Sequence, residues 1–220
     1  MPVWTFDDAI QNAAALLNDA AQNTYTNAIL TPYFRKAYTE LVDKLDIIGA
    51  PVIREQTAVL TVPANTTRIA ASGTTPLLPA DMSLPLEVKE RPTGSSINIL
   101  YNPMQQKAWE PNVVPGVNLT YWTWRENEIK LPGATQSIDI IISYLKDLPI
   151  PTSGLALAIT PSYVYLSART AELAASKIME DKDRALDLKI DAKEAMDKIE
   201  TYAILGMQNY PVRRQPYRRR

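Results

Sequence analysis

The distribution of proline constrains this chain most strongly, because proline seldom continues a helix or a central strand. Most of the 17 prolines lie between residues 52 and 150, where short β-branched or aromatic runs alternate with turn residues. That texture is typical of strands joined by turns. We therefore expect a β module over 52–150, with candidate strands at Ala58–Val62, Ser96–Tyr101, Asn118–Trp124, Glu128–Leu131 and Ile138–Leu145.

Two of these strands form a predicted hairpin. The aromatic run Tyr121–Trp124 and the run Ile129–Leu131 flank a polar stretch, so we expect the turn near Glu126-Asn127. The run Ile138–Leu145 lacks regular alternation of apolar and polar residues. This strand is therefore expected at the centre of the sheet or covered on both faces.

Helical patterns precede the β module, over residues 1–51. Thr5 is placed to cap a first helix, with Asp8 in capping-box spacing and apolar residues recurring at three- and four-residue steps after it. A polar connector, Gln22–Thr26, then separates this helix from a second helical pattern.

The second pattern carries a broad apolar stripe. Thr31-Pro32 could mark its start, because proline is tolerated in the first turn of a helix. Gly49-Ala50-Pro51 is expected to end it, because glycine favours the left-handed conformation that closes a helix.

Helical patterns return over residues 151–205. Thr160 is predicted to cap, and Pro161 to open, a long alanine-rich helix. The acidic stretch Glu180–Asp183 interrupts the pattern, and Asp183 can cap a further helix. We expect these C-terminal helices to pack with the N-terminal helices.

Together the patterns predict an α+β fold. A helical framework, made of the N-terminal helices and a long C-terminal helical pair, holds an inserted antiparallel β module, and an extended basic arm follows over 206–220. With 46% apolar residues, 220 residues suffice to bury one full core without metals or disulfides.

Composition narrows the possible chemistry. The chain has no cysteine and no histidine, which excludes thiol nucleophiles, thiolate or imidazole metal ligands and the commonest general base. Its seven glycines form no phosphate-binding motif. We expect no enzymatic activity, cofactor or metal. No signal peptide or membrane span is apparent, so a soluble, unsecreted protein is expected.

The C-terminal arm concentrates positive charge. Five of the 23 basic residues fall in the last eight positions, which leaves 18 basic against 24 acidic residues, a net charge of −6, in the rest of the chain. The arm has no acidic residue to pair with its arginines, so it is not expected to fold alone. Its predicted binding residues are Tyr210, Pro211, Arg213, Arg214, Pro216, Tyr217, Arg218, Arg219 and Arg220.

Three interpretations of the arm stay open: a docking peptide, a nucleic-acid-binding arm and a solubility tail. Docking is favoured. Tyrosines can anchor in pockets, prolines lower the entropy lost on ordering, and arginines can pair with carboxylates through two hydrogen bonds.

The aromatic run Tyr121–Trp124, with Trp109 before it, could form a stacking platform for sugars or bases. Alternate aromatics on a strand more often pack a core or a subunit interface, which is the interpretation we favour.

Paired acidic residues suggest one enzymatic alternative. Glu126 with Glu128, or Asp7 with Asp8, could act as a carboxylate pair in glycoside hydrolysis, but nothing nearby indicates an acid held in a pocket. The Glu180–Asp183 cluster lacks the ligand spacing of an EF-hand and is more simply a solvated turn.

Three stretches of the chain resemble the head-to-tail adaptor family of tailed bacteriophages, also called head completion or portal-adaptor proteins. They are a tyrosine-rich helix, a leucine-proline-x-aspartate lead into the β part, and a proline-opened, alanine-rich helix followed by a charged turn. In this sequence they are Tyr33–Val42, Leu78–Met82 and Thr160–Ala185.

The resemblance implies a structural virion protein of the neck, at the head-tail interface, assembled in the host cytoplasm. It implies a homo-oligomeric ring of twelve copies that docks under the portal protein, joins tail, stopper or nozzle proteins below, and lets genomic DNA pass through its lumen. The arm over 206–220 would bind the portal, and no membrane is involved. The alternative is a nucleic-acid-binding protein that uses the arginine tail.

Overall fold

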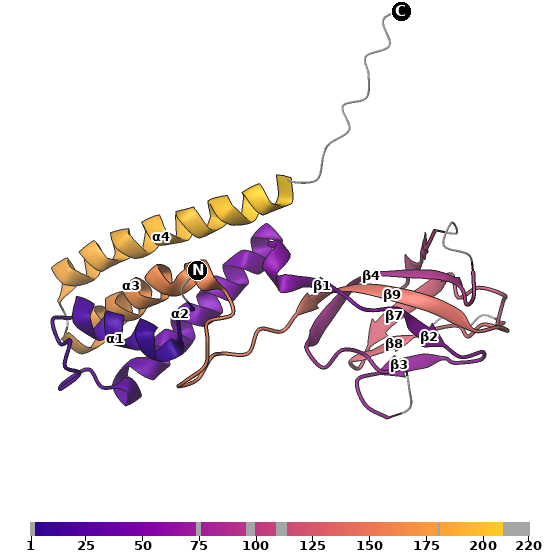
Figure 1. Ribbon diagram of the computed structural model, residues 1–220, viewed down its shortest axis with the longest axis horizontal. Helices are drawn as coiled ribbons and strands as arrows, with labels where there is room; N and C mark the ends of the chain where they lie inside the picture. The colour runs from indigo at the N-terminus through magenta and orange to yellow at the C-terminus, as the bar shows by residue number, and fades with distance from the viewer. Residues whose placement is uncertain (1–2, 74–75, 96–99, 109–113, 180, 209–220) are drawn as a thin grey trace, which may run out of the picture. The chain divides into compact units, whose positions relative to one another are not determined.

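The computed structural model describes residues 3–73, 76–95, 100–108, 114–179 and 181–208. The chain divides into two compact units, a helical unit formed by Met1–Val52 with Leu148–Arg220 and a β unit formed by Ile53–Asp147 (Figure 1). The chain is thus α+β, with the strands inserted between helices from its two ends, as the sequence predicts. All the predicted arm-binding residues lie outside the described residues.

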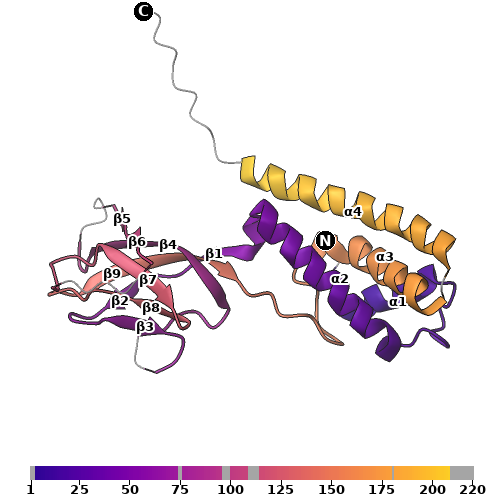
Figure 2. The ribbon, with the colours of Figure 1, turned by 180° about the vertical axis from the view of Figure 1, so that it is seen from behind.

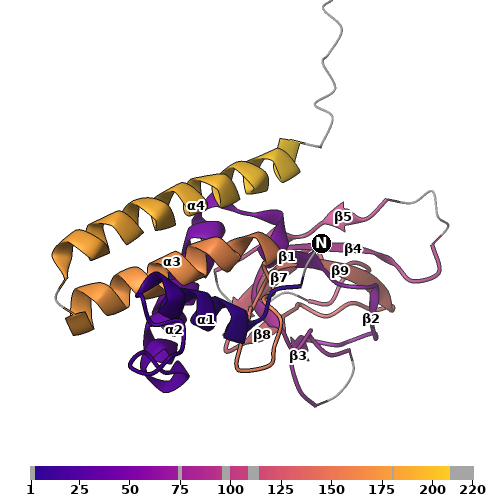
Figure 3. The ribbon, with the colours of Figure 1, turned by 60° about the vertical axis from the view of Figure 1, so that its left-hand side comes forward.

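The helical unit is organised around α3, which contacts the other three helices (Figures 1 and 3). Nine of its side chains are buried, which accounts for its alanine-rich composition, since small residues let neighbouring helices approach. The helices are α1 (Phe6–Leu16), α2 (Asn27–Ile48), α3 (Tyr163–Ala174) and α4 (Lys182–Gln208), with the 3-10 turn η2 (Thr160–Ser162) before α3 and the π-helical turn η3 (Ala175–Met179) after it.

The start of α1 confirms the predicted capping box. The Thr5 hydroxyl accepts a hydrogen bond from the Asp8 N–H at 3.2 Å, and the Asp8 carboxylate accepts one from the Thr5 N–H at 2.9 Å. The Thr5 hydroxyl also donates to the Asp8 carboxylate at 2.7 Å, and this bond, followed by the one from the Thr5 N–H, lowers the pKa of Asp8. Two N–H groups that the helix itself leaves unpaired are thereby satisfied.

The predicted start of α2 at Thr31-Pro32 is wrong. The helix begins at Asn27, and Pro32 lies inside it. Leu30 is fully buried and its N–H donates to the Thr26 carbonyl at 3.0 Å, so the first turn is held by packing as well as hydrogen bonding. Before it, the Asp19 carboxylate accepts backbone N–H bonds from three residues of the polar connector, Asn23, Thr24 and Tyr25.

The start of α4 also differs from the prediction. Asp183 lies in the first turn of the helix, and Asp181 does the capping instead, because its carboxylate accepts the Arg184 N–H at 2.9 Å. The Arg184 guanidinium in turn donates to the Leu16 carbonyl at the end of α1. The first turn of α4 is thereby tied to the end of α1, while Lys182 and Asp183 are exposed, in keeping with the predicted solvated turn, and Glu180 lies outside the described residues.

The β unit contains two sheets (Figure 2). One follows the order β1-β9-β4-β5, with β2 also paired to β9, and the other follows β3-β8-β7-β6. All pairings are antiparallel except that of β6 with β7. The strands are β1 (Arg54–Gln56), β2 (Leu60–Val62), β3 (Arg68–Ala70), β4 (Met82–Pro92), β5 (Asn102–Pro103), β6 (Gln105–Gln106), β7 (Tyr121–Arg125), β8 (Glu128–Lys130) and β9 (Ile138–Lys146).

The central strand of the larger sheet is β9, as its lack of alternation predicts. It pairs with β4, a strand that sequence patterns missed because Pro85, Pro92 and several charges interrupt its apolar residues. Two shifts in register interrupt the pairing in the N-terminal half of β4, between Met82 and Leu84 and between Pro85 and Glu87. Of the predicted strand Ser96–Tyr101, residues 96–99 lie outside the described residues and the last two are not in a strand.

The predicted hairpin joins β7 to β8, and its turn lies at Glu126-Asn127. Both residues have positive φ, 56° and 57°, as a type I′ turn requires. Trp122 on β7 is 1% exposed and belongs to the core of this unit.

A buried carboxylate organises the segment before β7. Glu90 on β4 is 6% exposed, and its two oxygens accept the N–H groups of Leu119 at 2.7 Å and Thr120 at 2.9 Å. Thr120 has φ +57°, an unfavourable value for a β-branched residue. The two charge-assisted bonds hold that conformation in place.

Within the part of the chain that the structure describes, no helix combines the length and the apolar character needed to cross a membrane.

Candidate docking site

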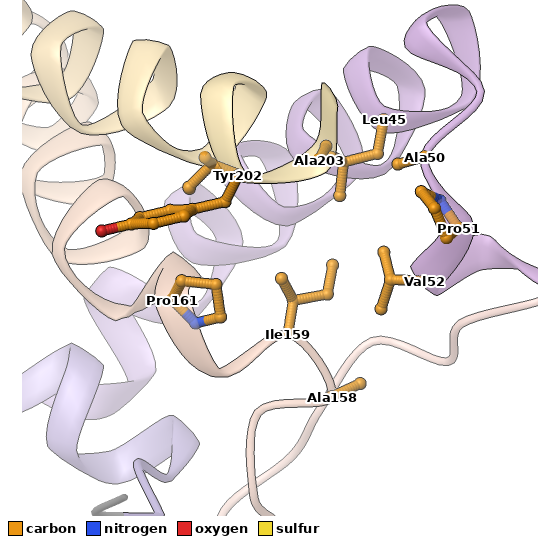
Figure 4. A pocket seen from close by; sticks show the side chains of 10 residues that line it. Leu45, Ala50, Pro51, Val52, Ala158, Ile159, Pro161, Tyr202 and Ala203 are labelled. Atoms are coloured by element: carbon orange, nitrogen blue, oxygen red, sulfur yellow. The ribbon is translucent and has the colours of Figure 1, made fainter. Parts of the chain in front are cut away.

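The helical unit carries an apolar groove of about 360 Å³ (Figure 4). Three segments form it: the end of α2 with the residues that follow, the stretch before α3, and the last part of α4. Its lining residues are Leu45, Ala50, Pro51, Val52, Ala158, Ile159, Pro161, Ile199, Tyr202 and Ala203. We call this cavity the apolar groove.

The end of α2 builds the first wall of the apolar groove. Gly49 adopts φ +72°, and its N–H donates to the Asp46 carbonyl at 2.9 Å. The Ala50 N–H donates to the Leu45 carbonyl at 2.9 Å, which completes a Schellman motif. This motif brings Leu45 and Ala50 together, so the predicted stop at Gly49 also shapes the wall.

The stretch before α3 builds the second wall. Ile159 is 4% exposed, and its carbonyl accepts the Ser162 N–H at 3.0 Å and the Ser162 hydroxyl. These bonds fold the chain into η2 and set Pro161 at the rim of the groove. Thr160 was predicted to cap, and Pro161 to open, the long helix; instead both lie in this 3-10 turn, and α3 begins at Tyr163 without a side-chain cap.

The third wall comes from α4. Ile199, Tyr202 and Ala203 recur at helical spacing and so lie on one face of the helix. Ile199 is buried, whereas Tyr202 is 65% exposed. In Figure 4 the Tyr202 ring lies at one side of the view, and Pro51 and Val52 lie at the other. Tyr202 therefore offers an aromatic face that the helical unit itself does not cover.

The chemistry of the apolar groove is that of a binding surface. Among the lining residues that the structure describes, Tyr202 alone has a polar side-chain atom, its hydroxyl, and the other nine are apolar. An apolar or aromatic side chain entering it would be stabilised mainly by removal of carbon surface from water, at about 25 cal/mol per Å².

A second, charged groove of about 470 Å³ lies among α2, α3 and α4. At its base the Arg169 guanidinium donates two hydrogen bonds to the Glu40 carboxylate and one to Glu172. The two bonds to Glu40 raise the pKa of Arg169 most, and the bond to Glu172 raises it further. Burial raises the pKa of the neighbouring Tyr165 to about 12. These paired charges link α2 with α3, so the charged residues at this groove are explained by their role in holding the two helices together.

The carboxylates proposed for glycoside hydrolysis have structural partners. The Glu128 carboxylate lies 2.7 Å from the Lys130 ammonium, and the hydrogen bond between them lowers the pKa of Glu128. A general acid in that chemistry needs a raised pKa. Glu126 forms part of the hairpin turn and lies 3.6 Å from the Arg125 guanidinium.

The pair at the N-terminus is engaged in the same way. Asp8 belongs to the capping box, and the Asp7 carboxylate accepts the Gly154 N–H at 2.6 Å and the Ser153 hydroxyl at 3.1 Å. Throughout the described ranges, no cluster of three or more acidic residues is placed to hold a metal ion.

The aromatic run packs rather than forming a platform. Trp122 is buried in the core of the β unit, and Trp124 is partly buried against that core. The Lys107 ammonium lies 4.6 Å from the centroid of the Tyr121 ring. Trp109 lies outside the described residues.

Sequence reasoning missed the apolar groove. Its lining comes from three segments far apart in the chain, so no single motif marks it. The available signal was Tyr202, which continues at helical spacing the buried residues Ala195 and Ile199 of the same helix. The chain matches no model of a known protein family and no curated protein.

Proposed function

We propose that this protein is a structural subunit of the neck of a tailed bacteriophage, a head-to-tail adaptor that docks under the portal through its C-terminal arm. The observation that carries the proposal is the continuity of α4 with that arm. The 27 residues of α4 run to Gln208, and the tyrosine-, proline- and arginine-rich residues follow directly. A rigid helix of about 40 Å would project the arm from a packed helical unit.

The construction of the chain supports a mechanical role. The helical unit is closed by both ends of the chain, and the β unit is inserted between them. Each unit has its own buried core. A subunit of this kind can present two separate surfaces to different neighbours, which joining a portal to tail, stopper or nozzle proteins requires.

The surface of α4 supports assembly with other copies. Leu186 and Ile190, one helical turn apart, are 57% and 52% exposed. Charges of both signs surround them on the same helix. In a homo-oligomeric ring of twelve copies, these residues would give a neighbouring subunit an apolar contact flanked by charges that select the register.

The acidic body suits passage of genomic DNA through a ring. Residues 1–212 carry 18 basic and 24 acidic residues, so most of the chain would repel phosphates. The arm is the exception, and its arginines are proposed to pair with carboxylates of the portal.

The proposal is tested by mixing the purified chain with the portal protein of the same phage and measuring complex mass by size-exclusion chromatography with light scattering. We expect a portal-dependent ring that is lost when residues 211–220 are deleted. A deleted chain that still assembles on the portal would contradict the assigned role of the arm.

A matched control separates docking from DNA binding, the alternative function of the arm. In one variant the five arginines after Val212 are changed to lysine, which keeps the charge but removes the two-pronged hydrogen bonding. Portal docking should weaken at least about tenfold while any DNA affinity and its salt dependence are largely kept. If the substitution weakened neither portal docking nor DNA binding, and DNA binding was tight and salt-sensitive, the nucleic-acid alternative would be favoured.

A further inference from the structure

We propose that the apolar groove binds the first part of the chain's own C-terminal arm, residues Tyr210–Val212, with Arg213 and Arg214 lying along α4. Tyr202 is shared by the apolar groove and by a neighbouring hollow of about 430 Å³ on the outer face of α4. A peptide leaving the apolar groove past Tyr202 therefore enters a second, differently charged site.

The arm is long enough to reach. Tyr202 lies six residues before Gln208, about 9 Å along the helix axis at 1.5 Å per residue. An extended chain covers the same distance in about three residues, at roughly 3.3 Å each. A chain that reverses after Gln208 therefore brings Pro211 and Val212 to the level of Tyr202.

The apolar part of the arm matches the groove in chemistry. Tyr210, Pro211 and Val212 are three consecutive residues with large carbon surfaces, and they are the first such run after α4. The groove offers Pro51, Val52 and the exposed ring of Tyr202, which are not covered by the helical unit. The fixed φ of proline reduces the entropy lost when the segment binds.

The charged part of the arm matches the hollow beyond Tyr202. That hollow is lined by Glu194, Asp197, Lys198, Thr201 and Tyr202, with two carboxylates and one ammonium. Glu194 and Asp197 are exposed and three residues apart, so they share a face of α4. Extended chain from Gln208 to Arg213 spans about 16 Å, the same as the helix from Gln208 back to Asp197.

The apolar groove is expected to bind the arm of its own chain rather than the arm of another molecule, because the chain's own arm is covalently attached to the end of α4. A segment joined by a few residues reaches its site at an effective concentration in the millimolar range. Weak individual contacts then suffice. If the proposed portal docking also holds, the portal would compete with the apolar groove for Tyr210–Val212, and assembly would begin with release of the arm.

The absence of cysteine from the sequence allows a direct test on the full-length protein alone. Ala158 lines the apolar groove and is exposed, so the double variant Ala158→Cys with Val212→Cys places one thiol in each partner. The matched control pairs Val212→Cys with Val164→Cys, on an exposed position of α3 outside the groove lining. Disulfide formation in a glutathione buffer is followed by mass spectrometry and non-reducing electrophoresis.

We expect the Ala158 pair to form an intramolecular disulfide at least about tenfold faster than the control pair, since the thiols are held together. Adding Tyr202→Glu to the Ala158 pair should remove most of that advantage, and circular dichroism checks that this exposed substitution leaves the fold intact. Equal rates for the two pairs would overturn the proposal. Disulfide-linked dimers without the intramolecular product would also overturn it and assign the groove to a second copy. Since no portal is present, failure of portal docking leaves this result unaffected.

Discussion

Arg169 on α3 and Glu40 on α2 are joined by two parallel hydrogen bonds, from Nε to Oε2 at 2.7 Å and from Nη2 to Oε1 at 3.1 Å. Their side chains are 22% and 32% exposed. Such two-pronged pairs are the strongest side-chain contacts between charged groups, and loss of one partner leaves the other partly buried and unpaired.

We therefore expect Arg169→Ala to lower the free energy of unfolding by about 2 kcal/mol, less than for a fully buried pair because water reaches both groups. Urea unfolding followed by circular dichroism measures the change. The control is Lys44→Ala, whose pair with Glu200 is more exposed and should contribute no more than about 0.5 kcal/mol. Equal effects of the two substitutions would contradict the assigned role of Arg169.

The raised pKa of Tyr165, about 12 because of burial and the nearby Glu40 carboxylate, predicts a loss of stability in alkali. An unfolded tyrosine ionises near pH 10, whereas the native one keeps its proton until about pH 12. Between these values the unfolded state binds fewer protons than the native state. The contribution of Tyr165 to the free energy of unfolding therefore falls by about 1.4 kcal/mol per pH unit. Tyr165→Phe should reduce this slope in urea titrations between pH 9 and 12. An unchanged slope would show that Tyr165 ionises normally.

The contact of Glu90 with the backbone of Leu119 and Thr120 predicts a second pair of effects. Glu90→Gln replaces one acceptor oxygen by an amide that faces an N–H group, so we expect a loss of about 2 kcal/mol. Thr120→Gly removes a side chain from a left-handed conformation and should gain about 1 kcal/mol. Thermal unfolding measures both changes. Glu87→Gln, on the same strand but 44% exposed, serves as control and should change stability by less than about 0.5 kcal/mol.

Two neighbours in the wall of the apolar groove should behave differently. Ile199 is 4% exposed, so Ile199→Ala should cost about 2 to 4 kcal/mol through lost burial and a residual cavity. Tyr202 is 65% exposed, so Tyr202→Ala should stay within about 0.5 kcal/mol. Denaturant unfolding distinguishes them. A large loss with Tyr202→Ala would mean that this side chain holds the fold and is not free for docking.

Predictions that depended on neighbouring residues in the chain were the most accurate. The capping box at Thr5 and Asp8 and the hairpin turn at Glu126-Asn127 each involve only a few consecutive residues. Their hydrogen bonds and dihedral preferences are local, so sequence spacing is enough to identify them. The central position of β9 was also predicted correctly, and its first three residues are all buried, although buried and half-buried residues alternate after Ile140.

Errors arose where tertiary packing outweighed a local preference. Pro32 suggested a helix start, yet the buried Leu30 anchors an earlier turn of α2. Pro85, Pro92 and four charges concealed β4, which forms because β9 pairs with it along most of its length, with register shifts only on either side of Leu84–Pro85. At α4, either Asp181 or Asp183 could cap by residue type, and only the fold selects Asp181.

The sequence by itself determined the α+β division of the chain, the local signals that start and end several elements, and the basic character of the arm. Only the tertiary structure decided that Leu45, Ile159 and Tyr202 meet in one apolar groove, and that Glu40 pairs with Arg169. Local hydrogen bonds and steric preferences act within a few residues. Contacts between residues more than a hundred positions apart arise from packing of whole elements, which no short stretch of sequence encodes.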